Sequence, residues 1–202
     1  MHDETLDNLA VLDSVDAEMA IKLGRVPAAI DALQSCEHTE NNVALIENGL
    51  RSIVGTMTIH IKMSALDELT SAPSLLAQQP LSMRDQLSTS KFNLEVLKTE
   101  ADFAESLPFR DRPETSSQLT LRKSEASGYQ YNGIDIPNSK SIRYSLTLAN
   151  QVDEACHDDN LLKSFWTWHR FQGNIPNYFA AMRLELEKIL EITGPLNGRN
   201  VP

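Results

Sequence analysis

Residues 6–23, LDNLAVLDSVDAEMAIKL, contain the pattern that decides the fold class. Their apolar side chains recur at intervals of three and four, which places them on one face of an α-helix. The apolar positions of this face are Leu6, Leu9, Leu12, Val15, Met19 and Leu23. Asp3 is positioned to cap the start of the helix, and Gly24 is positioned for the left-handed residue that often ends one. Pro27 suits the first turn of a second, short helix over residues 28–36, so the sequence predicts an N-terminal helical hairpin.

Two further apolar stripes predict long helices. The first runs from Val43 to Leu69 at helical spacing, but residues 57–64 also alternate between apolar and polar side chains, as a half-buried strand does. We predict a helix for residues 57–64, because the helical stripe continues to Leu69 without a turn signal, and a strand is the alternative. The second stripe runs from Met83 to Ala104 and predicts a helix that ends before Pro108.

The pattern changes after this point. Apolar side chains alternate along several short stretches, and Asn132-Gly133 is typical of the tight turn of a β-hairpin. We therefore predict an antiparallel region of three or four strands, and the alternative is a mobile segment with one hairpin. Helical spacing then returns, with Gly173 expected to end one helix and Pro176 expected to begin the next.

The predicted fold class is mainly α (α+β): a helical hairpin or bundle with a small antiparallel β-hairpin region inserted before the C-terminal helices. The predicted parts are an acidic aliphatic helical region (1–107), a linker or exposed loop (108–118), the β-hairpin region (119–149), the C-terminal helices (150–194) and a tail (195–202).

Composition restricts the function classes. The net charge of −10 lies in residues 1–108, which hold 17 acidic and 7 basic residues, so this half is not expected to bind nucleic acid directly. The charge is compatible with a basic partner, with imitation of nucleic acid, or with a solvated helical face. No apolar run approaches the roughly 20 residues of a membrane helix. Cys36 and Cys156 are too few for a disulfide framework, so we predict reduced thiols and a cytoplasmic protein.

Aromatic residues gather near the C-terminal end. None precedes Phe92, whereas six of the twelve lie in residues 165–179, FWTWHRFQGNIPNYF. Aromatic and arginine side chains are enriched at binding hot spots. Trp166 and Trp168 point about 200° apart on a helix, so both cannot easily face one core and one of them can be exposed as a contact residue. The expected structural role is nevertheless that both pack the β region onto the C-terminal helices. The predicted partner-binding residues are Trp166, Trp168, Arg170, Phe171 and Tyr178.

Chemical motifs are few. The chain contains no phosphate-binding glycine loop and no GxSxG or HExxH motif. His157-Asp158 resembles in part the metal-binding pair of helical phosphohydrolases of the HD type, which also need an upstream His and a downstream Asp, and no Asp follows Asp159. Capping of the next helix by Asp158 or Asp159 is the expected role.

A zinc site is the other metal hypothesis. Cys36, His38, Cys156 and His157 could form one only if folding brings the two pairs together, and buried thiols are the expected alternative. We therefore predict no catalytic residue, no metal ligand and no cofactor.

The sequence predicts a non-enzymatic protein–protein interaction module, such as an adaptor, assembly factor or regulator. The expected partner is another protein, and the charge favours a basic one. The aliphatic helices also allow a homo-oligomer, whereas neither direct nucleic-acid binding nor membrane insertion is expected. The alternatives are an acidic nucleic-acid mimic that inhibits a basic partner and a metal-dependent hydrolase that uses His157 and Asp158.

Overall fold

The computed structural model describes residues 1–54, 59–107, 116–131 and 134–197, with side chains in all of these except 124–131, 134–143 and 195–197. The elements in chain order are α1 (His2–Gln34), α2 (Glu40–Ile53), α3 (Ser64–Ser71), α4 (Pro73–Leu76), α5 (Leu81–Ser106), β1 (Leu119–Tyr131), β2 (Ile134–Leu148), α6 (Val152–Ala155), α7 (Asp159–Gln172) and α8 (Ile175–Asn197). The predicted fold class, mainly α with a small antiparallel hairpin before the C-terminal helices, is confirmed.

The chain divides into two compact units. The first unit comprises Met1–Ile21, Thr56–Leu107 and Phe171–Pro202, and the second comprises Lys22–Gly55 and Pro108–Arg170. Among the residues that the structure describes, no helix combines the length and the apolarity that a membrane span requires.

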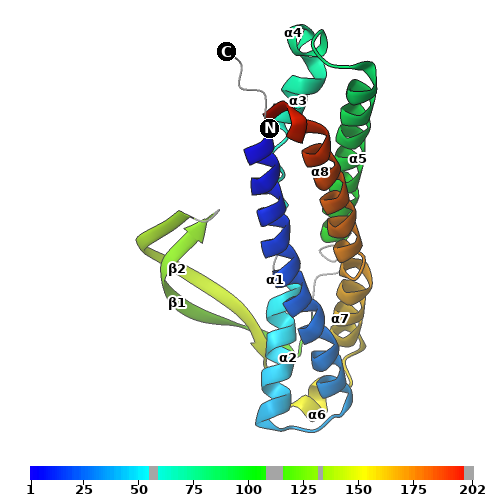
Figure 1. Cartoon of the computed structure of the whole chain (residues 1–202). Coiled ribbons are helices and arrows are strands. Elements are labelled where there is room, and N and C mark those ends of the chain that lie inside the picture. The colour runs from blue at the N-terminus through cyan, green and yellow to red at the C-terminus, as the bar shows by residue number, and fades with distance from the viewer. Residues whose placement is uncertain (55–58, 108–115, 132–133, 198–202) are drawn as a thin grey trace. The chain divides into compact units, whose positions relative to one another are not determined.

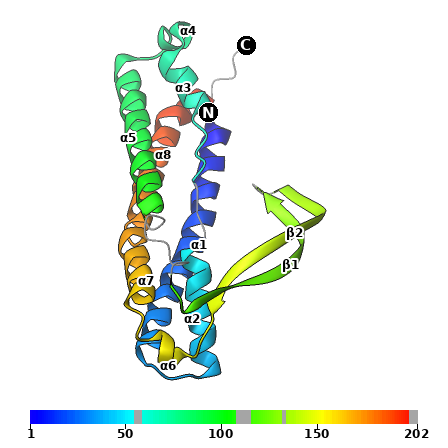
Figure 2. The same ribbon diagram turned by 180° about the vertical axis from the view of Figure 1, so that it is seen from behind.

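The first unit contains the paired helices α5 and α8, which lie side by side in both views (Figures 1 and 2). Each helix buries an apolar stripe at intervals of three, four and seven, as an amphipathic helix does when it faces a core. The buried apolar residues of these stripes are Met83, Leu87, Leu94, Ala101 and Ala104 on α5 and Ile175, Phe179, Met182, Leu186 and Ile189 on α8.

The predicted long helix across residues 57–64 is wrong. Helix α2 ends at Ile53, residues 59–63 are neither helix nor strand, and α3 begins at Ser64, while residues 57 and 58 lie outside the described part. The side chain of Asn8 makes both backbone hydrogen bonds of Lys62: its Oδ1 accepts from the amide at 2.9 Å, and its Nδ2 donates to the carbonyl at 2.8 Å. A distant side chain therefore replaces the helical hydrogen bonds at this position.

The same segment is held by the first turn of α1. The carboxylate of Glu4 accepts hydrogen bonds from the Ser64 hydroxyl at 2.6 Å and from the Ala65 amide at 3.0 Å. These bonds satisfy a free amide at the start of α3 and place a negative charge where the helix dipole favours one.

The expected break between two N-terminal helices is also wrong, since α1 is one helix from His2 to Gln34 with Pro27 inside it. An interior proline costs roughly 3 kcal/mol. Val26, Ile30 and Leu33 are nevertheless buried, so side-chain packing in the second unit outweighs that cost. The helix ends instead at Gln34, and Cys36, two residues later, adopts the left-handed conformation with φ of 54°.

The β region has two strands rather than the three or four predicted. Among the described residues, β1 and β2 form a two-stranded antiparallel sheet (Figure 1). The alternating stretches are continuous parts of two long strands, paired from Leu119 with Leu148 to Tyr131 with Ile134, with one irregularity between Ser127 and Tyr129. This register leaves a two-residue connection at the predicted Asn132-Gly133 turn, which lies outside the described residues, as does most of the predicted linker 108–118.

The prediction of reduced thiols is wrong as well, because Cys36 and Cys156 form a disulfide. The bond joins positions 120 residues apart in sequence, with a Cα–Cα distance of 5.3 Å. The ends of α1 and α6 meet only in the folded second unit, so the local sequence contained no sign of the pairing.

The two C-terminal helices end and begin where the sequence predicted. Helix α7 ends at Gln172, immediately before Gly173, and α8 begins at Ile175 with Pro176 in its first turn. Helix α8 continues to Asn197, so it includes the first residues of the predicted tail.

Candidate binding surface on α5 and α8

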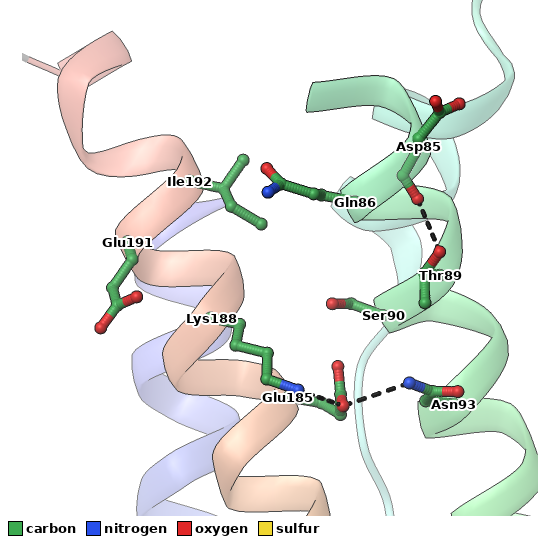
Figure 3. A pocket seen from close by; sticks show the side chains of 9 residues that line it. All are labelled: Asp85, Gln86, Thr89, Ser90, Asn93, Glu185, Lys188, Glu191 and Ile192. Atoms are coloured by element: carbon green, nitrogen blue, oxygen red, sulfur yellow. Dashed lines mark hydrogen bonds and ion pairs between the residues drawn. The ribbon is translucent and has the colours of Figure 1, made fainter. Parts of the chain in front are cut away.

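The side chain of Glu185 forms a polar link between α8 and α5 in the first unit (Figure 3). Its Oε1 accepts a hydrogen bond from Asn93 Nδ2 at 3.1 Å and one from Lys188 Nζ at 2.7 Å. Burial raises the pKa of Glu185, but hydrogen bonds from Lys188, Ser90 and Asn93 and the charge of Lys188 outweigh it, so the pKa lies below its ordinary value. The carboxylate is therefore charged at neutral pH and joins the two helices.

A polar pocket of about 320 Å³ lies on one side of this link. Its lining carries three carboxylates and a single ammonium group, so the pocket has a net negative charge and suits a cation. Figure 3 shows Asp85 on α5 and Glu191 on α8, with the Glu191 side chain on the side of α8 that faces away from α5. The lining residues are Asp85, Gln86, Thr89, Ser90, Asn93, Glu185, Lys188, Glu191 and Ile192.

An apolar groove of about 260 Å³ shares the Asn93–Glu185–Lys188 link with the polar pocket. Three large apolar side chains line the groove and are exposed: Phe92 at 64%, Leu184 at 58% and Val96 at 42%. Phe92 and Val96 are one helical turn apart on α5, so they present one surface. We call the lining of the groove and of the polar pocket together the α5–α8 surface.

Sequence reasoning missed this surface because it followed only the buried stripes of the two helices. Phe92 and Val96 are four residues apart but lie outside the stripe that contains Leu87 and Leu94. One sequence feature could have indicated the α5–α8 surface: a second pair of apolar residues at helical spacing that lies outside the core stripe.

The predicted aromatic site is divided between the two units. Trp166, Trp168 and Arg170 belong to the second unit, and Phe171 and Tyr178, both partly exposed, belong to the first. Trp166 is 52% exposed whereas Trp168 is only 2% exposed, so one tryptophan faces solvent and the other is in the core. Arg170 is exposed.

Asp158 caps α7, as the sequence predicted. Its Oδ1 accepts hydrogen bonds from the amides of Asn160 at 2.9 Å and Leu161 at 3.3 Å, and its Oδ2 accepts one from the Ser116 hydroxyl. Burial raises the pKa of Asp158, but the hydrogen bonds from Ser116, Asn160 and Leu161 lower it by more. The pKa of Asp158 therefore lies below its ordinary value. Both carboxylate oxygens are thus used by groups of the second unit, while the neighbouring His157 is exposed.

Folding does bring together most of the hypothetical zinc ligands. The sulfur atoms of Cys36 and Cys156 and a ring nitrogen of His157 lie within 4.8 Å of one another in the second unit. His38 has another role, because its Nδ1 accepts a hydrogen bond from the Val152 amide at the start of α6, at 3.1 Å.

The chain matches no family model, no curated protein and no solved structure.

Proposed function

We propose that the protein is a non-enzymatic protein–protein interaction module that binds an amphipathic helix of a basic partner protein on the α5–α8 surface. The observation that carries the proposal is the exposure of Phe92, Val96 and Leu184 around one groove. Large apolar side chains gathered in one place indicate an interaction site more strongly than the same residues scattered singly.

The form of the groove favours a helix as the occupant. It lies between two helices, and a third helix can insert side chains from positions i, i+3 and i+4 into such a groove. Burial of a large apolar side chain contributes about 1.5–3 kcal/mol, so several such contacts in the groove, together with the charged contacts beside it, would offset part of the cost of association.

The charge beside the groove favours a basic occupant. Asp85 and Glu191 are exposed carboxylates of the adjoining polar pocket, where a lysine or arginine at the edge of the bound helix would meet them. Such rim charges mainly set the association rate and the choice of partner, and salt weakens them.

The nucleic-acid mimic is a weaker alternative in the first unit. It needs acidic side chains that are available to a partner, yet many acidic residues of this unit form ion pairs within the unit. Pairs between residues far apart in sequence are Asp7 with Lys62, Asp13 with Arg183 and Asp67 with Lys91. The metal-dependent hydrolase is weaker for a different reason, since Asp158 already accepts hydrogen bonds at both oxygens.

A test of the proposal uses the full chain and two synthetic helical peptides as probes. One peptide carries Leu at helical spacing on one face and Lys on the other face. The second peptide has the same sequence with Glu in place of every Lys. We expect the Leu/Lys peptide to bind and the Leu/Glu peptide to bind at least about tenfold more weakly, as measured by isothermal titration calorimetry.

Three variants locate the binding site. Phe92→Ser and Leu184→Ser should each weaken binding of the Leu/Lys peptide about tenfold or more, since each removes a large apolar contact. Leu81→Ser is the matched control, because Leu81 is 73% exposed in the same unit and does not line the groove. Equal binding by all three variants, or by both peptides, would show that the groove is not the site.

The oligomeric state distinguishes a second copy of the chain from a different partner. If the wild-type protein sediments as a dimer and Leu184→Ser sediments as a monomer, the groove binds another copy and the proposed basic partner is wrong. We expect monomers for both proteins.

A further inference from the structure

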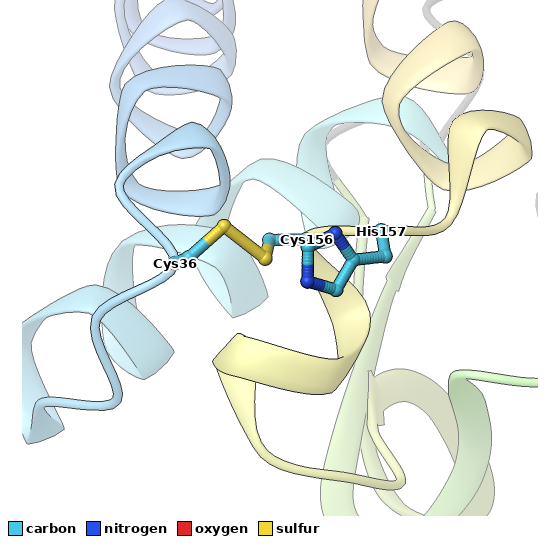
Figure 4. A group of neighbouring side chains, drawn as sticks. All are labelled: Cys36, Cys156 and His157. Atoms are coloured by element: carbon cyan, nitrogen blue, oxygen red, sulfur yellow. A yellow bond between two sulfur atoms is a disulfide. The ribbon is translucent and has the colours of Figure 1, made fainter.

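We propose that the Cys36–Cys156 disulfide is reversible and that its reduced form, together with His157, is a zinc site in the second unit. Figure 4 shows the disulfide between the end of α1 and the end of α6, with the imidazole of His157 beside it. The proposal is independent of the α5–α8 surface, which belongs to the first unit.

The three ligand atoms are already gathered. Both sulfurs and a nitrogen of His157 lie within 4.8 Å of one another. A tetrahedral zinc ion with Zn–S distances of about 2.3 Å and Zn–N distances of about 2.0 Å holds its ligand atoms slightly less than 4 Å apart. A small separation of the two sulfurs after reduction therefore produces the spacing that zinc requires.

The backbone at Cys36 also supports a role for its side chain. Cys36 is in the left-handed region with φ of 54°, which is costly for residues other than glycine and is most often occupied by glycine at the end of a helix. Glycine would end α1 at lower cost but would place no sulfur next to Cys156. Helix termination alone therefore does not explain why position 36 is a cysteine, and the position of its sulfur next to Cys156 does.

The cluster is accessible to both reagents that the reaction needs. Cys36 and Cys156 are partly exposed, and His157 is exposed. A dithiol reductant transfers two electrons and two protons to the S–S bond, which breaks to give two thiols, and the reductant itself becomes a disulfide. Zn²⁺ then displaces the two thiol protons and binds both thiolates and the neutral imidazole.

The donor set selects the metal. Two thiolates and one imidazole are soft to intermediate ligands that suit Zn²⁺ and do not suit Mg²⁺ or Ca²⁺, which take oxygen ligands. Water would supply the fourth ligand, since among the described residues His38 is not part of the gathered cluster and its Nδ1 accepts a hydrogen bond from the Val152 amide. In a reducing compartment such as the cytoplasm, zinc would thus replace the covalent link between α1 and α6.

The test uses the full chain before and after reduction with a water-soluble phosphine, which takes up the oxygen of water as it converts the disulfide to two thiols. Co²⁺ serves as the spectroscopic probe. We expect one Co²⁺ per reduced chain, with a thiolate-to-cobalt charge-transfer band and visible bands of tetrahedral cobalt. Zn²⁺ should abolish these bands, and the oxidised chain should show none.

Variants identify the ligands. His157→Ala should weaken Co²⁺ and Zn²⁺ binding by at least about tenfold, and Cys36→Ser should abolish the charge-transfer band or reduce it to that of one thiolate. His60→Ala is the matched control, because His60 is an exposed histidine of the first unit, and its affinity should equal that of the wild type.

Circular dichroism of the reduced chain separates the site from a purely structural bond. If the reduced chain unfolds and zinc does not restore its helicity, the disulfide is only structural and the proposal is wrong. It is also wrong if the reduced, folded chain shows no thiolate-to-cobalt band, or if His157→Ala binds metal as tightly as the wild type.

Discussion

Gly49 of α2 lies so close to Ala29 of α1 that a Cβ atom at position 49 would be 2.3 Å from the Cβ of Ala29. Side-chain carbons in folded proteins do not approach to this distance. The same added atom would lie 3.0 Å from Cε1 of Phe165 on α7. Glycine at this position therefore lets three helices of the second unit meet.

Replacing Gly49 by alanine should lower the free energy of unfolding by about 1–3 kcal/mol, the usual cost of an overpacked core. Urea denaturation monitored by circular dichroism measures the change. Gly24→Ala is the control, because nothing lies within 4 Å of a Cβ there and the residue is inside α1. It should raise stability by roughly 0.5–1 kcal/mol through helix propensity alone. If the two variants changed stability in the same direction, the close approach of α1 and α2 would be disproved.

The two tryptophans of α7 should respond in opposite ways to truncation. Trp168 is buried, so Trp168→Ala should cost about 3–5 kcal/mol, whereas Trp166→Ala should change stability by no more than about 0.5 kcal/mol. Thermal unfolding of both variants measures the difference. A Trp168→Ala protein as stable as the wild type would instead favour a partner-contact role for this residue.

The two aspartates at the start of α7, Asp158 and Asp159, should also differ in their effect on stability. Asp158 caps the helix through two amides, so Asp158→Ala should cost about 0.5–2 kcal/mol. Asp159 is exposed, and its Oδ2 lies 3.9 Å from Lys163 Nζ, so Asp159→Ala should be close to neutral. Chemical denaturation compares the two, and equal losses would contradict the capping geometry.

Glu185 should make the stability of the first unit depend on pH. Its pKa in the folded chain lies below the ordinary value, so folding favours the charged form. This contribution is complete above the unfolded-state pKa of about 4.3 and is lost as the pH falls through the lower, folded-state pKa.

Glu185→Gln should therefore cost about 1–3 kcal/mol at pH 7 and less at pH 3, which is below the unfolded-state pKa, so that part of the contribution of the charged form is lost. Urea titrations at the two pH values measure the difference. Glu191→Gln is the control, because Glu191 lines the same pocket but is exposed, and its effect should be small at both pH values. A Glu185→Gln cost that is equal at pH 3 and pH 7 would exclude the charged link between α5 and α8.

The local sequence was sufficient for the features that neighbouring residues determine. The stripe from Met83 to Ala104 predicted α5, and Gly173 with Pro176 predicted the boundary between α7 and α8. The different exposure of Trp166 and Trp168 was one of two expectations that the sequence left open, and helical geometry is compatible with it because residues two apart point in different directions.

Only the tertiary structure decided the features that depend on distant residues. Asn8 replaces helical hydrogen bonds at Lys62, and burial keeps α1 continuous through Pro27, although local propensity predicts the opposite at both places. Cys36 meets Cys156 only because α1 and α6 end at the same point of the second unit. The spacing of apolar residues predicts which side chains share one face of a helix or strand. Packing between segments far apart in sequence decides which other segment that face contacts.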